Sequence, residues 1–302
     1  MRELVVLGTA SQAPTRHRNH NGYFLRWDGE GVLFDPGEGT QRQFLLAGVS
    51  PASITAICIT HFHGDHCLGL PGILQRLSLD RTTRSIPVFF PASGREYFDR
   101  LRHASVYRDD VDVRATPVSA DGPVSTAPLL TIVARRLAHE PQTFGWRLEE
   151  PSGRRFVPEL LDRAGISGPS VGALERQGWI DRDGRRIELA EVSRERPGQS
   201  MAFVMDTGLC DGALELAADV DLLVCESTFT TSDEDLARRY RHLTAADAAR
   251  LARDAGARLL VLTHFSQRYP DSRVLADEAA AIFPDVVAAE DLLRVPVPAR
   301  RG

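Results

Sequence analysis

The stretch Ile57–Leu74 reads ICITHFHGDHCLGLPGIL and holds three histidines and an aspartate within six consecutive positions. The four side chains are His61, His63, Asp65 and His66. Ionisable groups that follow an apolar, strand-like run are costly to bury unless they bind a partner. Their spacing does not place them on one helix face, so we expect a tight loop in which Gly64 supplies backbone freedom.

This combination of side chains predicts a metal site. Imidazole and carboxylate groups suit Zn²⁺, and also Mn²⁺ or Fe²⁺. Three further candidates, His139, Asp206 and His264, follow later apolar runs, where strands should end and sites in α/β sheets usually lie. Five histidines and two carboxylates match the needs of two ions about 3.5–4 Å apart, bridged by Asp206 and a water.

Strand-like and helix-like segments alternate through both halves of the chain. Strands are expected at residues 3–8, 22–27, 31–34, 54–60, 87–90, 129–136, 201–205, 222–225 and 258–263. Helices are expected at 68–78, 94–104, 212–217 and 244–255. The last helix begins with Thr244, with Asp247 three positions later, a close variant of a capping box. The alternation indicates a layered α/β domain spanning residues 1–302.

One segment interrupts this alternation. Residues 153–199 are rich in Arg, Gly and Pro and contain nine Arg against eight Asp and Glu. A long segment of this kind inside a compact domain is usually functional or mobile. We interpret it as a protruding arm inserted into the domain, with an ordinary surface insertion as the alternative.

Composition and charge exclude several classes of protein. With 43% hydrophobic and 25% charged residues the chain has an ordinary globular composition. A net charge of −5 argues against a general nucleic-acid coat, but not against a local basic site, because charges are screened beyond about 8–10 Å. No apolar run approaches the roughly 18 residues of a membrane helix, and Glu3 interrupts the stretch that a signal peptide would need. We expect a soluble, cytoplasmic protein without a membrane partner.

The motifs also carry a resemblance. HFHGDH followed by His139, Asp206 and His264 resembles the metallo-β-lactamase-fold hydrolases, which implies an αββα sandwich with the metals at one edge. LGTASQAPTRHRN, FDPGEGTQRQ, ITHFHGDHCLGLPG, HEPQTFGWRL, ESTF and LTHFSQRY, in this order, resemble the bacterial ribonuclease Z family of tRNA 3′-processing endonucleases. The resemblance spans nearly the full length. The departures from the family motifs are Ser170, Val171 and Ala173 in the arm, Val204-Met205 before the aspartate, and Leu243.

For the metals, the resemblance implies two zinc ions. One would be held by His61, His63 and His139. The other would be held by Asp65, His66 and His264, with Asp206 between the two ions. Asp35 is expected to orient a ligand histidine.

For the chemistry, the resemblance implies hydrolysis of a phosphodiester by metal-bound hydroxide. Zinc lowers the pKa of bound water from about 15.7 towards 7 and neutralises charge on the phosphate. In the family scheme Asp65 accepts the proton of the attacking water, His242 protonates the departing 3′ oxygen and Glu226 orients His242. The products are a tRNA with a 3′-hydroxyl and a trailer with a 5′-phosphate. The alternatives are helix capping for His242 and a buried structural carboxylate for Glu226.

Four residues are candidates for binding substrate. Arg268 lies four residues after His264, where it can form a forked contact with phosphate, a surface salt bridge being the alternative. Arg18 matches the RN motif of the family. Gly168 and Pro169, in GISGPSVGAL, match the exosite arm with which the family grips the tRNA elbow.

We therefore expect a zinc-dependent endoribonuclease that removes 3′ trailers from precursor tRNA. The resemblance implies a homodimer, because in the family the arm of one subunit serves the tRNA bound to the other. The alternative is a small-molecule phosphodiesterase on the same scaffold, for which the arm has no use. A third hypothesis is an RNA-binding protein with a decayed site, which the complete set of candidate ligands argues against.

Overall fold

The structure is a computed structural model that describes residues 1–126 and 130–300. Within these residues the chain divides into two compact units. The first consists of Met1–Glu149 and Ser200–Ala299, and the second is built on Glu150–Gln199. The second unit coincides closely with the segment that the sequence set apart as an insertion.

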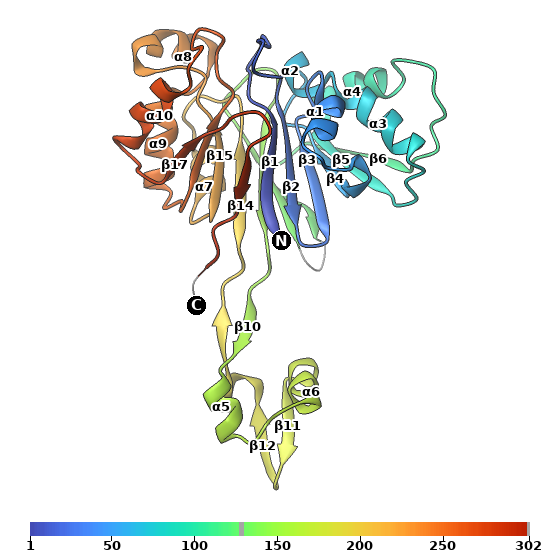
Figure 1. Ribbon diagram of the computed structural model, residues 1–302, viewed down its shortest axis with the longest axis vertical. Coiled ribbons are helices and arrows are strands. Elements are labelled where there is room, and N and C mark those ends of the chain that lie inside the picture. Colours follow the sequence, from blue (N-terminus) through green and yellow to red (C-terminus); the bar gives the residue numbers. More distant parts are fainter. Residues whose placement is uncertain (127–129, 301–302) are drawn as a thin grey trace. The chain divides into compact units, whose positions relative to one another are not determined.

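Two β-sheets form the first unit, and in the described part of the chain each has seven strands (Figure 1). Across the first sheet the strands are β18 (Arg294–Pro296), β1 (Arg2–Gly8), β2 (Gly22–Trp27), β3 (Glu30–Phe34), β4 (Ala56–Cys58), β5 (Ile86–Pro91) and β6 (Val113–Val118). Across the second they are β17 (Val286–Ala288), β16 (Leu260–Thr263), β15 (Leu222–Glu226), β14 (Ser200–Val204), β9 (Phe144–Glu149), β8 (Thr131–Arg136) and β7 (Gly122–Thr126). Strands β3 to β6 run parallel, as do β14 to β17.

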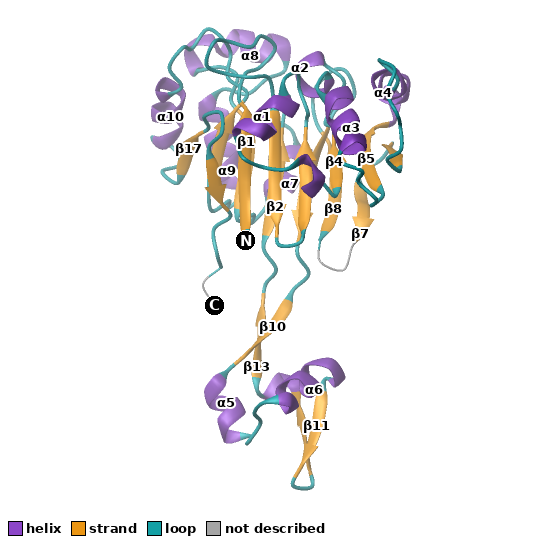
Figure 2. Cartoon of the chain, turned by 45° about the vertical axis from the view of Figure 1, so that its right-hand side comes forward, coloured by secondary structure: helices purple, strands orange, loops and turns teal. Residues whose placement is uncertain are grey.

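The two sheets pack face to face over an apolar core, in which the rings of Tyr23 and Phe203 lie 5.1 Å apart. Helices cover the outer faces of the sheets (Figure 2). The first sheet carries α1 (Thr40–Leu46), α3 (Leu70–Leu79) and α4 (Arg95–Arg102). The second carries α7 (Asp211–Ala217), α9 (Ala245–Asp254) and α10 (Arg273–Ala280). The αββα sandwich expected from the sequence is confirmed.

The elements of the first unit begin and end close to their predicted limits. Helix α9 begins with the expected capping box, because Thr244 Oγ1 accepts from Asp247 N at 3.1 Å and the Asp247 carboxylate accepts from Thr244 N at 3.3 Å. The strand expected from residue 129 is β8, and residue 129 lies outside the described residues. The elements that were not foreseen include strands β6, β7, β9, β17 and β18 and helices α1, α8 (Glu234–Tyr240) and α10. No helix in the described residues is long and apolar enough to cross a bilayer.

The second unit, taken by itself, is an ordered α/β structure with a small core. Its elements are β10 (Gly153–Phe156), α5 (Pro158–Arg163), α6 (Pro169–Gln177), β11 (Trp179–Arg182), β12 (Arg185–Glu188) and β13 (Ser193–Arg196). Strand β10 pairs with β13, and β11 with β12, both antiparallel. The buried residues of its core are Ile166, Leu174, Ile187 and Val192.

Its unusual composition has a structural reason. Pro158 and Pro169 stand at the start of α5 and α6, where a missing N–H costs nothing. Asp183 and Gly184 both have positive φ, 49° and 75°, as the tight turn between β11 and β12 requires. Several of the Gly and Pro residues that set this segment apart therefore belong to helix starts and a hairpin.

Candidate metal centre

The histidine motif is divided between two local structures. Its first half, up to His63, is extended chain after β4, whereas Asp65 and His66 lie in the short helix α2 (Gly64–Cys67). The expectation of one tight loop is therefore wrong for the second half. Gly64 does not adopt a positive φ; a Cβ at this position would come within 2.9 Å of Leu68 Cδ1. Gly64 therefore does not supply the left-handed backbone freedom that was expected of it.

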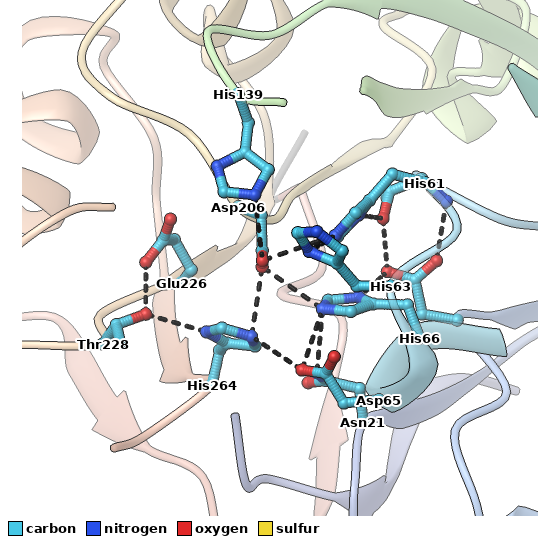
Figure 3. A network of polar contacts seen from close by, with 12 residues as sticks. Asn21, His61, His63, Asp65, His66, His139, Asp206, Glu226, Thr228 and His264 are labelled. Atoms are coloured by element: carbon cyan, nitrogen blue, oxygen red, sulfur yellow. Dashed lines mark hydrogen bonds and ion pairs between the residues drawn. The ribbon is translucent and has the colours of Figure 1, made fainter. Parts of the chain in front are cut away.

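The other candidate ligands come from the second sheet. Asp206 and His264 follow β14 and β16, and His139 follows β8. The two oxygens of the Asp206 carboxylate face different histidines. Figure 3 shows Asp206 among these histidines. Asp206 Oδ2 lies 3.5 Å from His61 Nε2 and 3.7 Å from His139 Nε2. Its Oδ1 lies 3.3 Å from His66 Nε2 and 3.1 Å from His264 Nε2.

The seven candidate ligands supply two groups in which all ligand atoms lie within 4.8 Å of one another, and a third such group joins Asp206 and His264 to His242. The first group is His61, His63, His139 and Asp206. The second is Asp65, His66 and His264. The structure thus brings together all seven residues, in the partition that the resemblance implied, with Asp206 beside both groups.

Buried polar atoms at this point test whether a cation fits. His139 Nε2, His264 Nε2 and Asp206 Oδ1 are buried and have no hydrogen-bond partner in the described part of the chain. Buried polar atoms normally have a partner, because an unmet one costs free energy. These three converge on the two ligand groups, and nitrogen with carboxylate oxygen is a donor set that divalent transition metals accept. The residues therefore fit a divalent metal.

Neighbouring residues fix which ring nitrogen faces the centre. His66 Nδ1 donates to Asp35 Oδ2 at 2.8 Å, the contact expected of Asp35. His139 Nδ1 donates to the carbonyl of Arg241 at 3.1 Å. Both partners can only accept, so Nδ1 carries a proton and Nε2 is the nitrogen that faces Asp206.

Charges around His66 couple metal binding to proton release. Burial alone would lower the pKa of His66, but the carboxylates of Asp206 and Asp65 outweigh burial and raise that pKa well above its ordinary value. Burial, aided by the charge on His66, lowers the pKa of His61 well below its ordinary value. A metal that binds His66 Nε2 must displace its proton.

Three site residues adopt left-handed backbone directly after a strand. The φ angles are 43° for Asp35, 36° for Asp206 and 60° for His264. Such a conformation costs about 1–3 kcal/mol per residue and persists only where the surroundings determine it, often at functional sites. The turn carries each side chain off its sheet and into the centre.

A second polar network stands beside the ligands. His242 Nδ1 donates to Glu226 Oε1 at 3.0 Å, and Glu226 is fully buried at the end of β15. Thr228 Oγ1 donates to Glu226 Oε2 at 2.5 Å and accepts from His264 Nδ1 at 2.8 Å. Burial alone would lower the pKa of His242, but the charges of Glu226 and Asp206 raise it to about 9. The network therefore holds a protonated imidazole next to the candidate metal ligands.

Comparisons with known proteins decide the family. The sequence model of the metallo-beta-lactamase superfamily matches residues 15–264. A ribonuclease Z of Streptomyces coelicolor is 57% identical over 303 residues, 100% of this chain and 99% of the relative. The chain belongs to the ribonuclease Z family. A ribonuclease Z of Nocardia farcinica is 58% identical over 306 residues, 99% of each chain, and one of Chlamydia caviae is 46% identical over 297 residues, 98% of this chain and 97% of the relative.

Solved structures support the fold of this ribonuclease Z family member. Human tRNase Z, short form, superposes with a TM-score of 0.71 at 24% identity, covering 98% of this chain and 100% of the human chain. The metallo-beta-lactamase fold protein YhfI of Bacillus subtilis gives a TM-score of 0.70 at 18% identity, with 97% and 98% covered. At these identities the two structures show the fold alone.

A cleft of about 670 Å³ opens over the metal ligands of this ribonuclease Z family member. Arg268 lines the cleft with an exposed side chain that forms no ion pair with any described residue. The alternative, a surface salt bridge, is therefore not observed within the described part of the chain.

The other three predicted substrate contacts lie elsewhere. Arg18 does not line this cleft; its guanidinium donates to the carbonyls of Tyr269 at 2.8 Å and Pro270 at 3.4 Å. It thus holds the backbone that follows Arg268, which is a positioning role. Gly168 and Pro169 lie in the second unit, at the start of α6, where Gly168 has a φ of 57°. Their contact with RNA stays a prediction.

Two residues of the site escaped the sequence analysis. Thr228, which joins Glu226 to His264, is part of ESTF, and its hydroxyl two positions after the strand-ending carboxylate was an available signal. Glu278 of α10 accepts from Thr231 N at 3.0 Å and from Ala246 N at 3.0 Å, and so holds both ends of the segment that carries His242. Its partners lie 47 and 32 positions away, so no local pattern could reveal it.

Asp35 offers a test of how the ligands are oriented. Asp35→Ala should weaken zinc binding about 10- to 100-fold, because His66 loses the acceptor that fixes its tautomer. Titration with zinc against a competing chelator measures this. The matched control is Asp28→Ala, a carboxylate that bonds Arg2 at 2.7 Å far from the centre and should leave affinity unchanged. Since Asp35 is fully buried, Asp35→Asn, which keeps the size, serves as the second variant; wild-type affinity in both variants would contradict the role.

Proposed function

We propose that the protein is a zinc-dependent endoribonuclease that removes 3′ trailers from precursor tRNA. The main support is that full-length relatives at 45–58% identity are named ribonuclease Z, while this chain keeps all seven candidate ligands in two adjoining groups and five of them line one cleft. A histidine-rich donor set favours zinc over manganese or iron. Two ligand groups that share Asp206 support two ions.

The residues of the cleft suit hydrolysis of a phosphodiester. Bound zinc ions would supply an activated water and neutralise charge on the phosphate. Arg268, unpaired among the described residues, can fork onto a non-bridging phosphate oxygen. Asp65, whose Oδ2 lies 3.3 Å from His66 Nε2 and 3.5 Å from His264 Nε2, is placed to accept the proton of the attacking water.

The leaving group needs a proton, and His242 can supply it. The departing atom is the 3′ oxygen of the last tRNA nucleotide, which leaves poorly as an alkoxide. His242 lines the cleft, is held by Glu226 and is protonated at neutral pH because its pKa is raised to about 9. A positioned acid of this kind contributes about 10²–10⁴-fold to the rate. The tRNA would keep a 3′-hydroxyl and the trailer a 5′-phosphate.

The rest of the proposal concerns tRNA binding and assembly. We propose that the second unit, with Gly168 and Pro169, is an exosite for precursor tRNA. A homodimer, in which the arm of one subunit serves the other, follows from the same family scheme, and light scattering coupled to gel filtration would measure it. A cytoplasmic location matches this substrate.

Removal of the second unit tests the function. A short Gly-Ser linker replaces Gly153–Gly198, and both proteins are assayed on a 3′-extended tRNA transcript and on a p-nitrophenyl phosphodiester. We expect transcript cleavage to fall about 10²-fold or more, because the second binding site is lost. Cleavage of the small diester should persist. The fold tolerates this change, since β9 and β14 are paired neighbours with Glu149 opposite Ser200, and a linker closes that hairpin.

The same assay separates the alternatives. If wild type cuts the transcript after the last tRNA nucleotide and the deletion loses only that reaction, the endoribonuclease proposal stands. If both proteins cut the diester equally and neither cuts the transcript, the protein is a small-molecule phosphodiesterase.

A further inference from the structure

Tyr240 is an aromatic residue at the metal cleft to which the proposed chemistry gives no role. It ends helix α8 (Glu234–Tyr240) and lines the cleft together with His242 and Arg268. Its side chain is 51% exposed, although it stands beside buried ligands. Tyr240 thus presents an exposed aromatic ring to a cleft that polar side chains line.

One face of the Tyr240 ring remains open. The guanidinium of Arg239 lies over the ring, 5.5 Å from its centre, and so covers one face. The described residues provide no aromatic or cationic partner for the other face and no hydrogen-bond partner for the hydroxyl. The packing of the first unit therefore does not explain why this face of the ring is exposed.

The backbone around Tyr240 is nevertheless firmly held. Arg241 adopts a left-handed conformation with φ 55°, and its carbonyl accepts from His139 Nδ1 at 3.1 Å. The Arg241 guanidinium bonds Glu140 at 3.0 Å, and His242 N donates to Ala237 O at 2.9 Å. The residue that follows Tyr240 is thus bonded to a candidate metal ligand, and the residue after that is the candidate acid.

We propose that the Tyr240 ring is a stacking platform for the nucleobase of the last tRNA nucleotide. This inference rests on the proposed function and names a binding subsite within it. Bases stack on exposed aromatic rings irrespective of their sequence, because every base has a π-face. Arg239 on the far face strengthens such a stack through a cation–π contact. Because the hydroxyl has no partner among the described residues, we assign the binding role to the aromatic ring and not to the hydroxyl.

The position of His242 selects this nucleotide. The oxygen that His242 protonates is the 3′ oxygen of the last tRNA nucleotide, and the base of that nucleotide is carried by the same ribose. Tyr240 stands two residues before His242, and both residues line the cleft. The platform holds the ribose while the 3′ oxygen meets the imidazole, which aligns the scissile bond.

A double-mutant cycle between enzyme and RNA tests the inference. Wild type and Tyr240→Ala are assayed under single-turnover conditions on a 3′-extended tRNA whose last tRNA nucleotide carries either its base or an abasic ribose. We expect Tyr240→Ala to lower kcat/KM on the normal RNA about 5- to 150-fold, the factor for one stacked base. The abasic ribose should cost wild type a similar factor and should cost Tyr240→Ala nothing further, because the partner is already absent.

Two variants serve as controls. Tyr240→Phe keeps the ring and should retain activity. Tyr97→Ala removes a tyrosine that is also 51% exposed but does not line the cleft, and it should cleave both RNAs as wild type does. Thermal melting of each variant shows that the fold is intact.

Every other outcome overturns the inference in a recognisable way. If Tyr240→Ala cleaves the normal RNA as fast as wild type, the ring makes no contact with the RNA that contributes to cleavage. If the losses from Tyr240→Ala and from the abasic ribose multiply, the ring acts on something other than that base. If wild type cleaves neither RNA, the proposed function itself is wrong and the subsite falls with it.

Discussion

Asp206→Ala is expected to abolish cleavage of precursor tRNA and to strip zinc from both ligand groups. Asp206 is the carboxylate that faces His61 and His139 through one oxygen and His66 and His264 through the other. Loss of a residue that only orients a ligand costs about 10- to 100-fold in affinity or activity. Loss of the ligand that both groups share should therefore exceed 100-fold in kcat/KM, and the bound metal should fall towards zero.

Elemental analysis of the purified variant, together with transcript cleavage, measures both effects. The matched control is Asp235→Ala, since the Asp235 side chain is fully exposed on α8 and should change neither quantity. Asp206→Asn keeps the size and one neutral oxygen, so it should retain more zinc than the alanine variant while remaining impaired. Two tightly bound zinc ions and full activity in Asp206→Ala would refute the shared-ligand geometry.

His242→Ala is expected to slow cleavage of precursor tRNA about 10²- to 10⁴-fold, the usual contribution of a general acid. The same variant should cut a p-nitrophenyl diester almost as fast as wild type. The difference has a chemical reason: a p-nitrophenolate leaves without a proton, whereas a ribose 3′ alkoxide does not. Equal losses on both substrates would assign His242 to metal binding, since it also lies within 4.8 Å of Asp206 and His264.

The pH profile gives a second measure of the same role. Burial lowers the pKa of His242, but the charges of Glu226 and Asp206 outweigh it and raise the pKa to about 9. The acid form is present below this pKa and is lost as pH rises through it, so the rate on precursor tRNA should fall on the alkaline side. Cations bound next to Asp206 offset its negative charge and so lower the pKa of His242. The fall in rate should therefore occur at about pH 9 or below.

Glu226→Gln tests what causes the fall in rate on the alkaline side of the pH profile. The substitution removes the nearest charge that raises the pKa of His242, so the alkaline fall should move to lower pH. Glutamine can keep the hydrogen bond from Thr207 N, which is 2.7 Å from Glu226 Oε1, so the buried site is preserved. Glu234→Gln, at an exposed position on α8, should leave the profile unchanged. If the rate of Glu226→Gln falls at the same alkaline pH as that of wild type, another group controls this fall.

The sequence predicted the fold and the inventory of the site well because both depend on local patterns. Apolar runs of strand length placed β14, β15 and β16, and a run that ends at Asp206 or His264 predicts where the side chain leaves the sheet. The prediction failed for Gly64, which begins the short helix α2 and does not adopt a positive φ. It set the second unit apart by its Gly and Pro but did not foresee that these residues begin helices and close a hairpin.

The sequence by itself determined the chemistry of the candidate ligands, since side-chain identity and the dense HFHGDH spacing already demand a metal. Only the tertiary structure decided how the ligands are shared. The two faces of Asp206, the contact of Asp35 with His66 and the place of Arg18 beside Tyr269 join residues far apart in the chain. Such contacts depend on which strand ends meet at one edge and on left-handed turns after them. A pattern within a short window of sequence predicts neither which strand ends meet nor where the left-handed turns lie.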